Sequence, residues 1–267
     1  MKSFRIEFTE KKITGHAGLV HFGRFIEKSG LKATLEKHLD VKRGPNANYS
    51  MADAVIMLAL GAIAGVKHIS QLAILRTDRV LRKLFEWEQF PASSTFGRIF
   101  RRFKPRHCQE LVEVEDTLRR KVWRKKRQRR VEMDMDSTVK GVFGAQEGAA
   151  KGYNPKKPGQ KSYHPLFCFI AGTRECLHSR FRTGSAYSAN GAREFVQECL
   201  ARMPAGVQNI FVRADSAFFD GALLDFLEER GLSCLIKVKL KNLAAVLEGQ
   251  TWTPLRRMPG WEAADFE

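Results

Sequence analysis

Two short segments with alternating apolar residues end in the same way, with an aspartate followed by a serine. The first covers residues 130–137 and contains Asp136, and the second covers residues 209–216 and contains Asp215. Alternation with a period of two predicts β-strands. Because sheet interiors favour β-branched and aromatic residues, a carboxylate belongs at the end of a strand, which is where ligands collect on open sheets.

This pattern leaves two interpretations of Asp136 and Asp215. On neighbouring strands the two carboxylates would share divalent ions, since Mg²⁺ takes a few carboxylate oxygens together with water and substrate phosphate. Alternatively, each aspartate caps a strand end or forms a turn, since Asp-Ser is common in turns. The order of the strands in the sheet decides between these interpretations.

From residue 131 onward the alternating pattern predicts strands at about residues 131–139, 163–171, 175–182, 209–215 and 233–239. Helices are predicted at residues 189–201, capped by Asn190 or Ser188, and at residues 220–230. Three strands, a helix, a strand, a helix and a strand is the order of an RNase H-like sheet, whose first and fourth strands are adjacent. The predicted fold class is therefore α/β, with Asp136 beside Asp215.

Before residue 127 the pattern is helical, apart from a short alternating segment at residues 4–8. Helices are predicted at about residues 19–30, 31–39, 50–66, 68–76, 78–85, 91–103 and 111–130. Ser50 and Asp53 have the spacing of a capping box at the start of the most apolar of these helices. We therefore expect a helical domain over residues 1–127.

The charge of the chain predicts an anionic partner. The net charge is +17, and 43% of the 267 residues are hydrophobic, which is enough for a folded core. Nucleic acid is the first candidate and a membrane surface the second. The longest apolar run, Ala54–Val66, has 13 residues and is too short to span a bilayer. We therefore expect DNA and no membrane.

Three groups of residues are candidates for contacts with DNA. The first group is Arg98, Arg101 and Arg102, and the second is Arg124, Lys125, Lys126 and Arg127. The third group is Lys151, Tyr153, Lys156, Lys157 and Lys161. Each group has an alternative explanation. The first fits the solvated face of a packed helix, the second partly compensates a helix dipole, and the third lies in a Gly- and Pro-rich segment that fits a flexible loop.

The five cysteines lie far apart, without a Cys-x-x-Cys pair. This spacing fits neither a zinc site nor a disulfide framework, and it suits a reducing cytoplasm. We expect the cysteines to be small buried hydrophobic residues.

The sequence resembles the DDE transposases of bacterial insertion sequences. The resemblance is carried by Met135–Val139, Gln146–Pro155, Ser162–Leu166 and Val212–Phe218, and it covers residues 130–240 best. It implies an RNase H-like core interrupted by a β-rich insertion. It also implies that Asp136 and Asp215 are the first two members of a catalytic triad that binds Mg²⁺ or Mn²⁺. Asp134, two residues earlier on the same face, is the reserve candidate.

The resemblance further implies what the protein does and how the chain is divided. It implies metal-dependent cleavage and transfer of DNA strands at the terminal inverted repeats and in target DNA. A homodimer in a synaptic complex, in the cytoplasm with the nucleoid, would carry out the reaction. The expected domains are residues 1–127 for DNA binding, 128–240 for part of the catalytic core, and 241–267 for the start of the insertion. His164 is expected to be a structural strand residue rather than a base.

One element of the family pattern has no match. The third acid is a glutamate on a helix after the insertion, and neither Glu262 nor Glu267 lies in such a helix. We therefore expect a C-terminally truncated transposase that is inactive alone. The alternative is a catalytically inactive DNA-binding fragment that occupies the element ends or inhibits the full-length enzyme. A third possibility is another nuclease of the RNase H fold.

Overall fold

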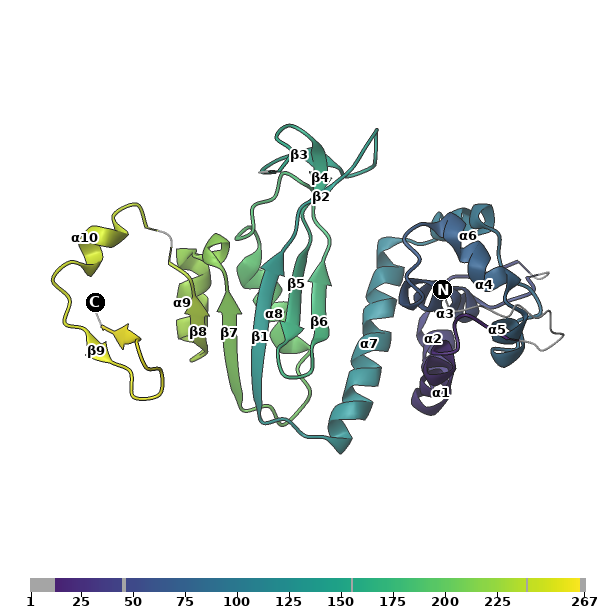
Figure 1. Cartoon of the computed structure of the whole chain (residues 1–267), viewed down its shortest axis with the longest axis horizontal. Helices are drawn as coiled ribbons and strands as arrows, with labels where there is room; N and C mark the ends of the chain where they lie inside the picture. The colour runs from purple at the N-terminus through teal and green to yellow at the C-terminus, as the bar shows by residue number, and fades with distance from the viewer. Residues whose placement is uncertain (1–12, 45–46, 155, 239, 265–267) are drawn as a thin grey trace, which may run out of the picture. The chain divides into compact units, whose positions relative to one another are not determined.

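The computed structural model describes residues 13–44, 47–154, 156–238 and 240–264 (Figure 1). The chain divides into two compact units, Met1–Lys126 and Arg127–Glu267. The strand predicted for residues 4–8 lies outside the described residues.

The first unit is helical, as the sequence predicts. Its elements are α1 (Leu19–Ser29), α2 (Leu31–His38), α3 (Met51–Ile63), the 3₁₀-helix η1 (Ile69–Leu72), α4 (Ala73–Thr77), α5 (Arg79–Leu84), α6 (Ser93–Phe100) and α7 (Pro105–Lys125). The predicted capping box is confirmed, because Ser50 Oγ accepts from the Asp53 N–H at 3.0 Å and Asp53 Oδ2 accepts from the Ser50 N–H at 3.1 Å.

The core of this unit forms where the apolar helix α3 meets a cluster of aromatic residues. Met57 and Leu60 of α3 are fully buried. Phe96 of α6 is also buried and makes an edge-to-face contact with Phe90, with ring centroids 6.0 Å apart. Because α6 turns Phe96 and Ile99 inward, the rest of its surface is left for polar and charged residues.

The helix predicted for residues 111–130 has different ends in the structure. α7 begins six residues earlier, with Pro105 as its first residue, since proline lacks the N–H that this position does not need. It ends at Lys125, and Arg130 already belongs to a strand. The predicted basic end of the helix is therefore divided between the last turn of α7 and the segment that follows.

The second unit contains a five-stranded sheet of β1 (Arg130–Ser137), β5 (Leu166–Ile170), β6 (Glu175–Arg180), β7 (Asn209–Ala214) and β8 (Ser233–Ile236). The strand order is β6-β5-β1-β7-β8. β5 is antiparallel to β1, and β7 is parallel to it. This order confirms the predicted α/β fold with an RNase H-like sheet, and it confirms that the first and fourth predicted strands are adjacent.

Helices α8 (Ala192–Ala201) and α9 (Gly221–Glu229) pack on the sheet (Figure 1). They bury Phe195 and Leu223, and the sheet buries Met133 and Val212. Successive side chains of a strand point to opposite faces. Glu132, Asp134 and Asp136 alternate with the buried residues of β1 and therefore lie on the other face of the sheet.

A second, smaller sheet lies beyond the end of β1 (Figure 1). It consists of β2 (Lys140–Gly141), β3 (Ala150–Lys151) and β4 (Lys161–Tyr163) in the order β2-β4-β3, and we call it the small sheet. The sequence predicts a loop here and one strand over residues 163–171. That strand is instead broken at His164 and Pro165, because a proline has no N–H for the ladder.

Two further sequence predictions are corrected by the structure. The N-cap of α8 is Gly191, at φ 68°, rather than Asn190 or Ser188, whose side chains bond elsewhere. The cysteines are not all buried: Cys168 and Cys199 are, whereas Cys108 and Cys234 are exposed.

After β8 the described chain forms α10 (Leu243–Leu247) and a two-stranded antiparallel sheet of β9 (Thr253–Pro254) and β10 (Glu262–Ala263). Trp252 and Trp261 are exposed in this segment. Within the described ranges, no helix combines the length and the apolar character needed to cross a membrane.

Candidate active site

The register between β1 and β7 brings the two predicted aspartates opposite each other. Met135 pairs with Ala214 in this parallel ladder, so the next residue on each strand is Asp136 on one side and Asp215 on the other. Neighbouring strands are about 4.8 Å apart, and register-matched residues of parallel strands point to the same face. Both side chains are exposed. The fold therefore places the two carboxylates side by side on the face of the sheet that is not buried against α8 and α9.

One carboxylate oxygen of each aspartate accepts a hydrogen bond from a nearby backbone N–H. Asp136 Oδ1 accepts a hydrogen bond from the N–H of Ser137 at 2.7 Å. Asp215 Oδ1 accepts from the N–H of Ala217 at 3.0 Å and caps the 3₁₀-helix η2 (Ser216–Phe218). These local hydrogen bonds use one oxygen of each carboxylate. The Oδ2 atoms accept no hydrogen bond from any residue that the structure describes.

Asp134, the reserve candidate, is occupied by an ion pair. Arg213 donates to it through two nitrogens, at 2.6 Å from Nε to Oδ1 and 2.8 Å from Nη2 to Oδ2. The same guanidinium lies 3.5 Å from Glu132. The hydrogen bond to Asp134 raises the pKa of Arg213. Because both Asp134 oxygens are engaged, this residue is a poorer metal ligand than Asp136.

The two strand-end carboxylates fit a divalent cation. Each has an oxygen free of hydrogen bonds, and neither forms an ion pair with a cation among the described residues. Carboxylate oxygens are the donors that Mg²⁺ and Mn²⁺ prefer, and a cation between them would relieve the repulsion of two adjacent negative charges. No third His, Cys, Asp or Glu joins them in a metal-sized group within the described part of the chain.

A buried hydrogen-bond chain lies directly behind Asp136. His164 is 5% exposed, and its Nδ1 donates to the carbonyl of Ala186 at 2.6 Å. Its Nε2 lies 3.1 Å from Ser137 Oγ, which in turn lies 2.7 Å from Ser188 Oγ. His164 is buried and hydrogen-bonded, but it lies between β4 and β5 rather than in the predicted strand. The sequence did not predict the contact between Ser188 and Ser137, because the two residues are 51 positions apart and nothing local marks the pair.

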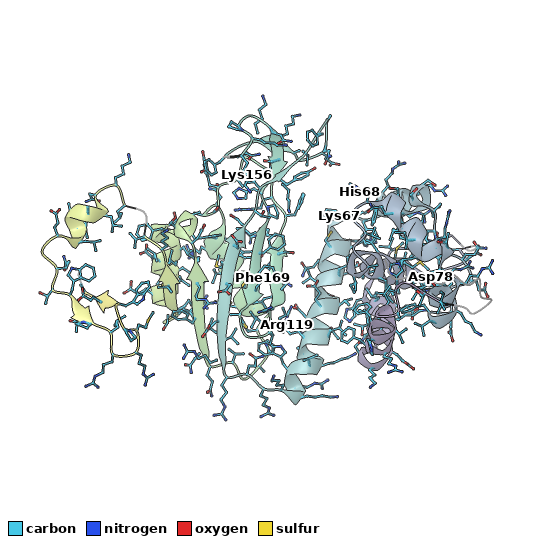
Figure 2. The ribbon with its side chains drawn as sticks, viewed as in Figure 1. Lys67, His68, Asp78, Arg119, Lys156 and Phe169 are labelled. Atoms are coloured by element: carbon cyan, nitrogen blue, oxygen red, sulfur yellow. The ribbon has the colours of Figure 1, made fainter. Side chains whose placement is uncertain are left out.

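The third group of predicted DNA contacts lies in β3, in β4 and in the segment between these strands. All five side chains are exposed: Lys151, Tyr153, Lys156, Lys157 and Lys161. Figure 2 shows Lys156 extending from this part of the fold. Two aromatic residues that the sequence analysis did not select are also exposed here, Phe143 at 78% and Phe181 at 71%. Lys157 lies 5.6 Å from the centre of the Phe143 ring. Cations and exposed aromatic rings together are typical of surfaces that bind nucleic acid.

The other two groups of predicted DNA contacts lie at the ends of helices. Arg98, Arg101 and Arg102 are at the end of α6, and Arg124, Lys125, Lys126 and Arg127 are at the end of α7 and just after it. All seven side chains are exposed. Arg98 donates to Thr95 Oγ1 and Arg102 to the carbonyl of Lys42. These bonds are to neutral groups, so the charges remain available to an anion.

The solved structures to which this chain is similar include transposase complexes. A piggyBac transposase synaptic complex with hairpin DNA has 16% sequence identity to this chain, with a TM-score of 0.41, over 90% of this chain and 53% of that one. The Mos1 transposase paired-end complex with the left transposon end has 10% identity and a TM-score of 0.28, over 78% of this chain and 71% of that one. This chain thus spans about half the length of the piggyBac transposase chain. No protein with a curated description matches it.

The match to a family model identifies the family of this chain. The family model for the transposase DDE domain group 1 matches residues 1–252, which is nearly the whole chain. The chain therefore belongs to the DDE transposases of this group.

Proposed function

We propose that this protein is a DNA transposase that cleaves and joins DNA strands at the ends of an insertion sequence, with Mg²⁺ or Mn²⁺ as cofactor. The observation that supports this most strongly is the pair Asp136 and Asp215, register-matched at the ends of two adjacent parallel strands, each with one free carboxylate oxygen. Turn formers need no such pairing, whereas a shared cation does.

In this proposal Asp136 and Asp215 would hold the divalent ion. When bound, the ion supplies charge that stabilises a phosphodiester under in-line attack. The N–H groups of Ser137 and Ala217 fix the carboxylates by bonding one oxygen of each. The His164–Ser137 hydrogen bond keeps the end of β1 in place. Arg213 engages both oxygens of Asp134, so this carboxylate would not serve as a ligand of the ion.

The substrates in this proposal are the terminal inverted repeats of the element and then target DNA. The basic groups on α6, on α7 and on the small sheet bind the phosphate backbone, because DNA binding gains free energy from releasing condensed counterions. A homodimer brings two ends together in a synaptic complex, and the protein works in the cytoplasm with the nucleoid.

The family pattern calls for a third acid, and no third carboxylate groups with the pair among the described residues. We therefore expect residues 1–267 to bind the ion and the DNA but to have weak or no cleavage activity alone. If the chain cleaves nothing under any metal condition and still binds the element ends, the second candidate holds: a DNA-binding protein that occupies those ends or inhibits complete enzymes.

The test is cleavage of a labelled duplex that carries an element end, with Mg²⁺ or Mn²⁺, by the wild-type chain and by Asp136→Ala and Asp215→Ala. Both substitutions should abolish the cleavage and leave DNA binding in EDTA unchanged. Asp134→Asn is the matched control, since it removes the same charge from the same strand face but alters a residue that Arg213 occupies.

Three results would contradict the proposal. The first is cleavage that survives loss of either strand-end aspartate, and the second is equal loss in Asp134→Asn. The third is preferential cleavage of an RNA:DNA hybrid, which would favour a different nuclease of this fold. Mn²⁺ binding measured by electron paramagnetic resonance on the same variants separates loss of the ion from loss of the fold.

A further inference from the structure

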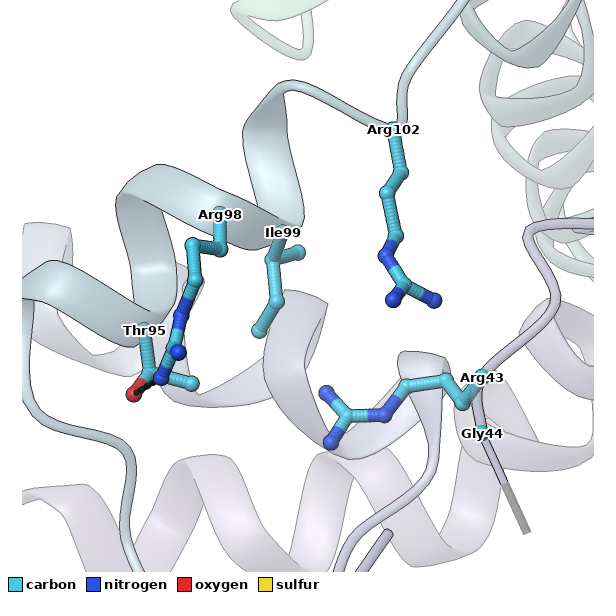
Figure 3. Close-up of a pocket in the computed structure, with 6 residues that line it drawn as sticks. All are labelled: Arg43, Gly44, Thr95, Arg98, Ile99 and Arg102. Atoms are coloured by element: carbon cyan, nitrogen blue, oxygen red, sulfur yellow. Dashed lines mark hydrogen bonds between the residues drawn. The ribbon is translucent and has the colours of Figure 1, made fainter.

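We propose that a pocket in the first unit binds one phosphodiester group of the DNA backbone. The pocket has a volume of about 210 Å³ and is lined by Arg43, Gly44, Thr95, Arg98, Ile99 and Arg102. Figure 3 shows the three arginine side chains around this hollow. The proposal rests on the proposed function for the identity of the ligand as DNA, and it adds a defined site to a surface that is otherwise only basic.

The pocket joins two parts of the chain that are far apart in sequence. Thr95, Arg98, Ile99 and Arg102 follow one another at spacings of three, one and three residues, so they share one face of α6 and its C-terminal extension. The opposite wall is Arg43 and Gly44, about fifty residues earlier. Only the fold brings Arg43 close to Arg98 and Arg102.

Each guanidinium is held in place by one contact. Arg98 Nη2 donates to Thr95 Oγ1 at 3.1 Å, and Arg102 Nη1 donates to the carbonyl of Lys42 at 3.0 Å. The third, that of Arg43, lies over the ring of Tyr49, 4.1 Å from its centre. A guanidinium has five N–H donors, so these contacts orient the groups and leave most donors free.

The charges of the pocket are not balanced by protein. None of the three arginines forms an ion pair with a carboxylate among the described residues. Three like charges around one cavity repel one another, and an anion in the cavity would relieve that repulsion. The fork geometry of arginine matches the oxygens of a phosphate.

The size and position of the pocket select the kind of phosphate. Pockets for drug-sized ligands have volumes of about 300–1,000 Å³. The smaller volume of this pocket suits a single phosphate group. Arg98 and Arg102 are exposed, so a phosphate carried on a duplex can reach them. A backbone phosphate of DNA and free inorganic phosphate share this chemistry, and the experiment below distinguishes them.

The test measures DNA affinity against salt concentration, in EDTA and with the full chain, for Arg43→Gln, Arg98→Gln and the double variant. Each single variant should lower the affinity about tenfold, as expected for loss of a charge-assisted hydrogen bond. Because both arginines hold the same phosphate, the double variant should lower the salt slope by about 0.9, the value for one contact, rather than by twice that. Arg102 is left intact because it tethers Lys42.

Arg76→Gln is the control, since Arg76 is an exposed arginine of α4 outside the pocket. An equal loss in this variant, or strictly additive losses in the double variant, would show diffuse attraction instead of a shared site. A titration with inorganic phosphate is the second arm. Saturable phosphate binding that needs Arg43, combined with unchanged DNA affinity in Arg43→Gln, would overturn the assignment to DNA. None of these readouts depends on cleavage, so loss of activity and loss of the pocket are separate results.

Discussion

At the scale of single residues, Asp134 and Asp136 differ in what their carboxylates contact. They lie on the same strand and the same face, two residues apart, and the sequence alone ranks them only through the family pattern. In the structure, Arg213 of the neighbouring strand pairs with Asp134 through two hydrogen bonds. Asp136 instead faces Asp215, one position beyond the last register pair. Arg213, two residues before Asp215, thus pairs with Asp134 and leaves the Asp136 carboxylate unpaired.

Arg213→Gln should therefore raise the affinity for Mn²⁺. The substitution removes a positive charge beside the site and frees the Asp134 carboxylate, so the attraction for a divalent cation increases, on the order of tenfold. Mn²⁺ titration followed by electron paramagnetic resonance measures this. Arg174→Gln, in the turn between β5 and β6, is the control for the loss of one charge. Unchanged or weaker Mn²⁺ binding in Arg213→Gln would contradict the proposed geometry.

His178 provides a prediction about pH. Burial lowers the pKa of His178 below its ordinary 6.5, and the Glu198 carboxylate offsets this only in part. Its Nε2 lies 2.7 Å from Glu198 Oε2, and its buried Nδ1 has no hydrogen-bond partner among the described residues. Protonation of Nδ1 would bury an unsatisfied N–H, which is the physical reason for the shift.

Because the folded state takes up this proton less readily than the unfolded state, the stability falls as the pH decreases from about 6.5 towards the lowered pKa. Above that window both states are neutral at His178 and it has no effect. Glu198, whose pKa is lowered by hydrogen bonds from His178 and Arg180 despite its burial, acts only below its ordinary 4.5. Between about pH 7 and pH 5.5, the free energy of unfolding of the wild type should fall more than that of His178→Phe. Urea denaturation measures this difference. An equal loss in both proteins would refute this.

At the scale of elements, the helix and strand positions follow largely from local pattern, and the exceptions have local causes. The Ser50–Asp53 capping box is visible in the sequence because all its atoms lie within four residues. The break between β4 and β5 follows from Pro165, but the sequence did not reveal that the two halves would join different sheets. The choice of Gly191 as N-cap of α8 depends on where Ser188 and Asn190 find other partners.

The small sheet is fixed to the rest of its unit by two glycines in close contact. A Cβ on Gly184 would lie 2.3 Å from the Ser162 carbonyl oxygen and 2.4 Å from that of Ala150. A Cβ on Gly152 would lie 1.8 Å from the Gly184 carbonyl oxygen. These neighbours are backbone atoms, which cannot move aside without shifting β3 or β4.

Gly184→Ala should therefore destabilise the protein by about 1–3 kcal/mol, the usual cost of overpacking. It should also raise amide hydrogen exchange in β4, because the strand must move to admit the methyl group. Gly172→Ala is the matched control, with nothing within 4 Å of the added Cβ, and a change within about 0.5 kcal/mol is expected for it. Comparable denaturation midpoints for the two variants would show that the contact does not fix the small sheet.

At the scale of the whole molecule, the net charge of +17 sets the affinity for a polyanion. The basic residues at the end of α7 and just after it are all exposed, so we assign them a part of the salt-dependent binding. The helix dipole accounts for cations in the last turn of α7. It does not account for those after Lys125, where the helix has ended.

A variant in which Arg124, Lys125, Lys126 and Arg127 are changed to glutamine should bind DNA with a shallower dependence on salt. Each lost phosphate contact lowers the slope of log K against log salt by about 0.9. The control removes four exposed cations from α1, α2 and α4 instead: Arg24, Lys28, Lys37 and Arg76. Fluorescence anisotropy over a range of salt concentrations measures both slopes. Equal slopes for the two variants would mean that net charge alone governs binding.

What the sequence by itself determined is the set of features that depend on near neighbours and on composition. The helical first part, the strand and helix order of the second, and the basic partner surface all follow from periodicity, capping and charge, which act within a few residues. What only the tertiary structure decided is which distant groups meet. Arg213 occupies Asp134, Ser188 supports Ser137, and Arg43 joins Arg98 across the pocket, because these contacts depend on strand register and helix packing, which no local pattern encodes.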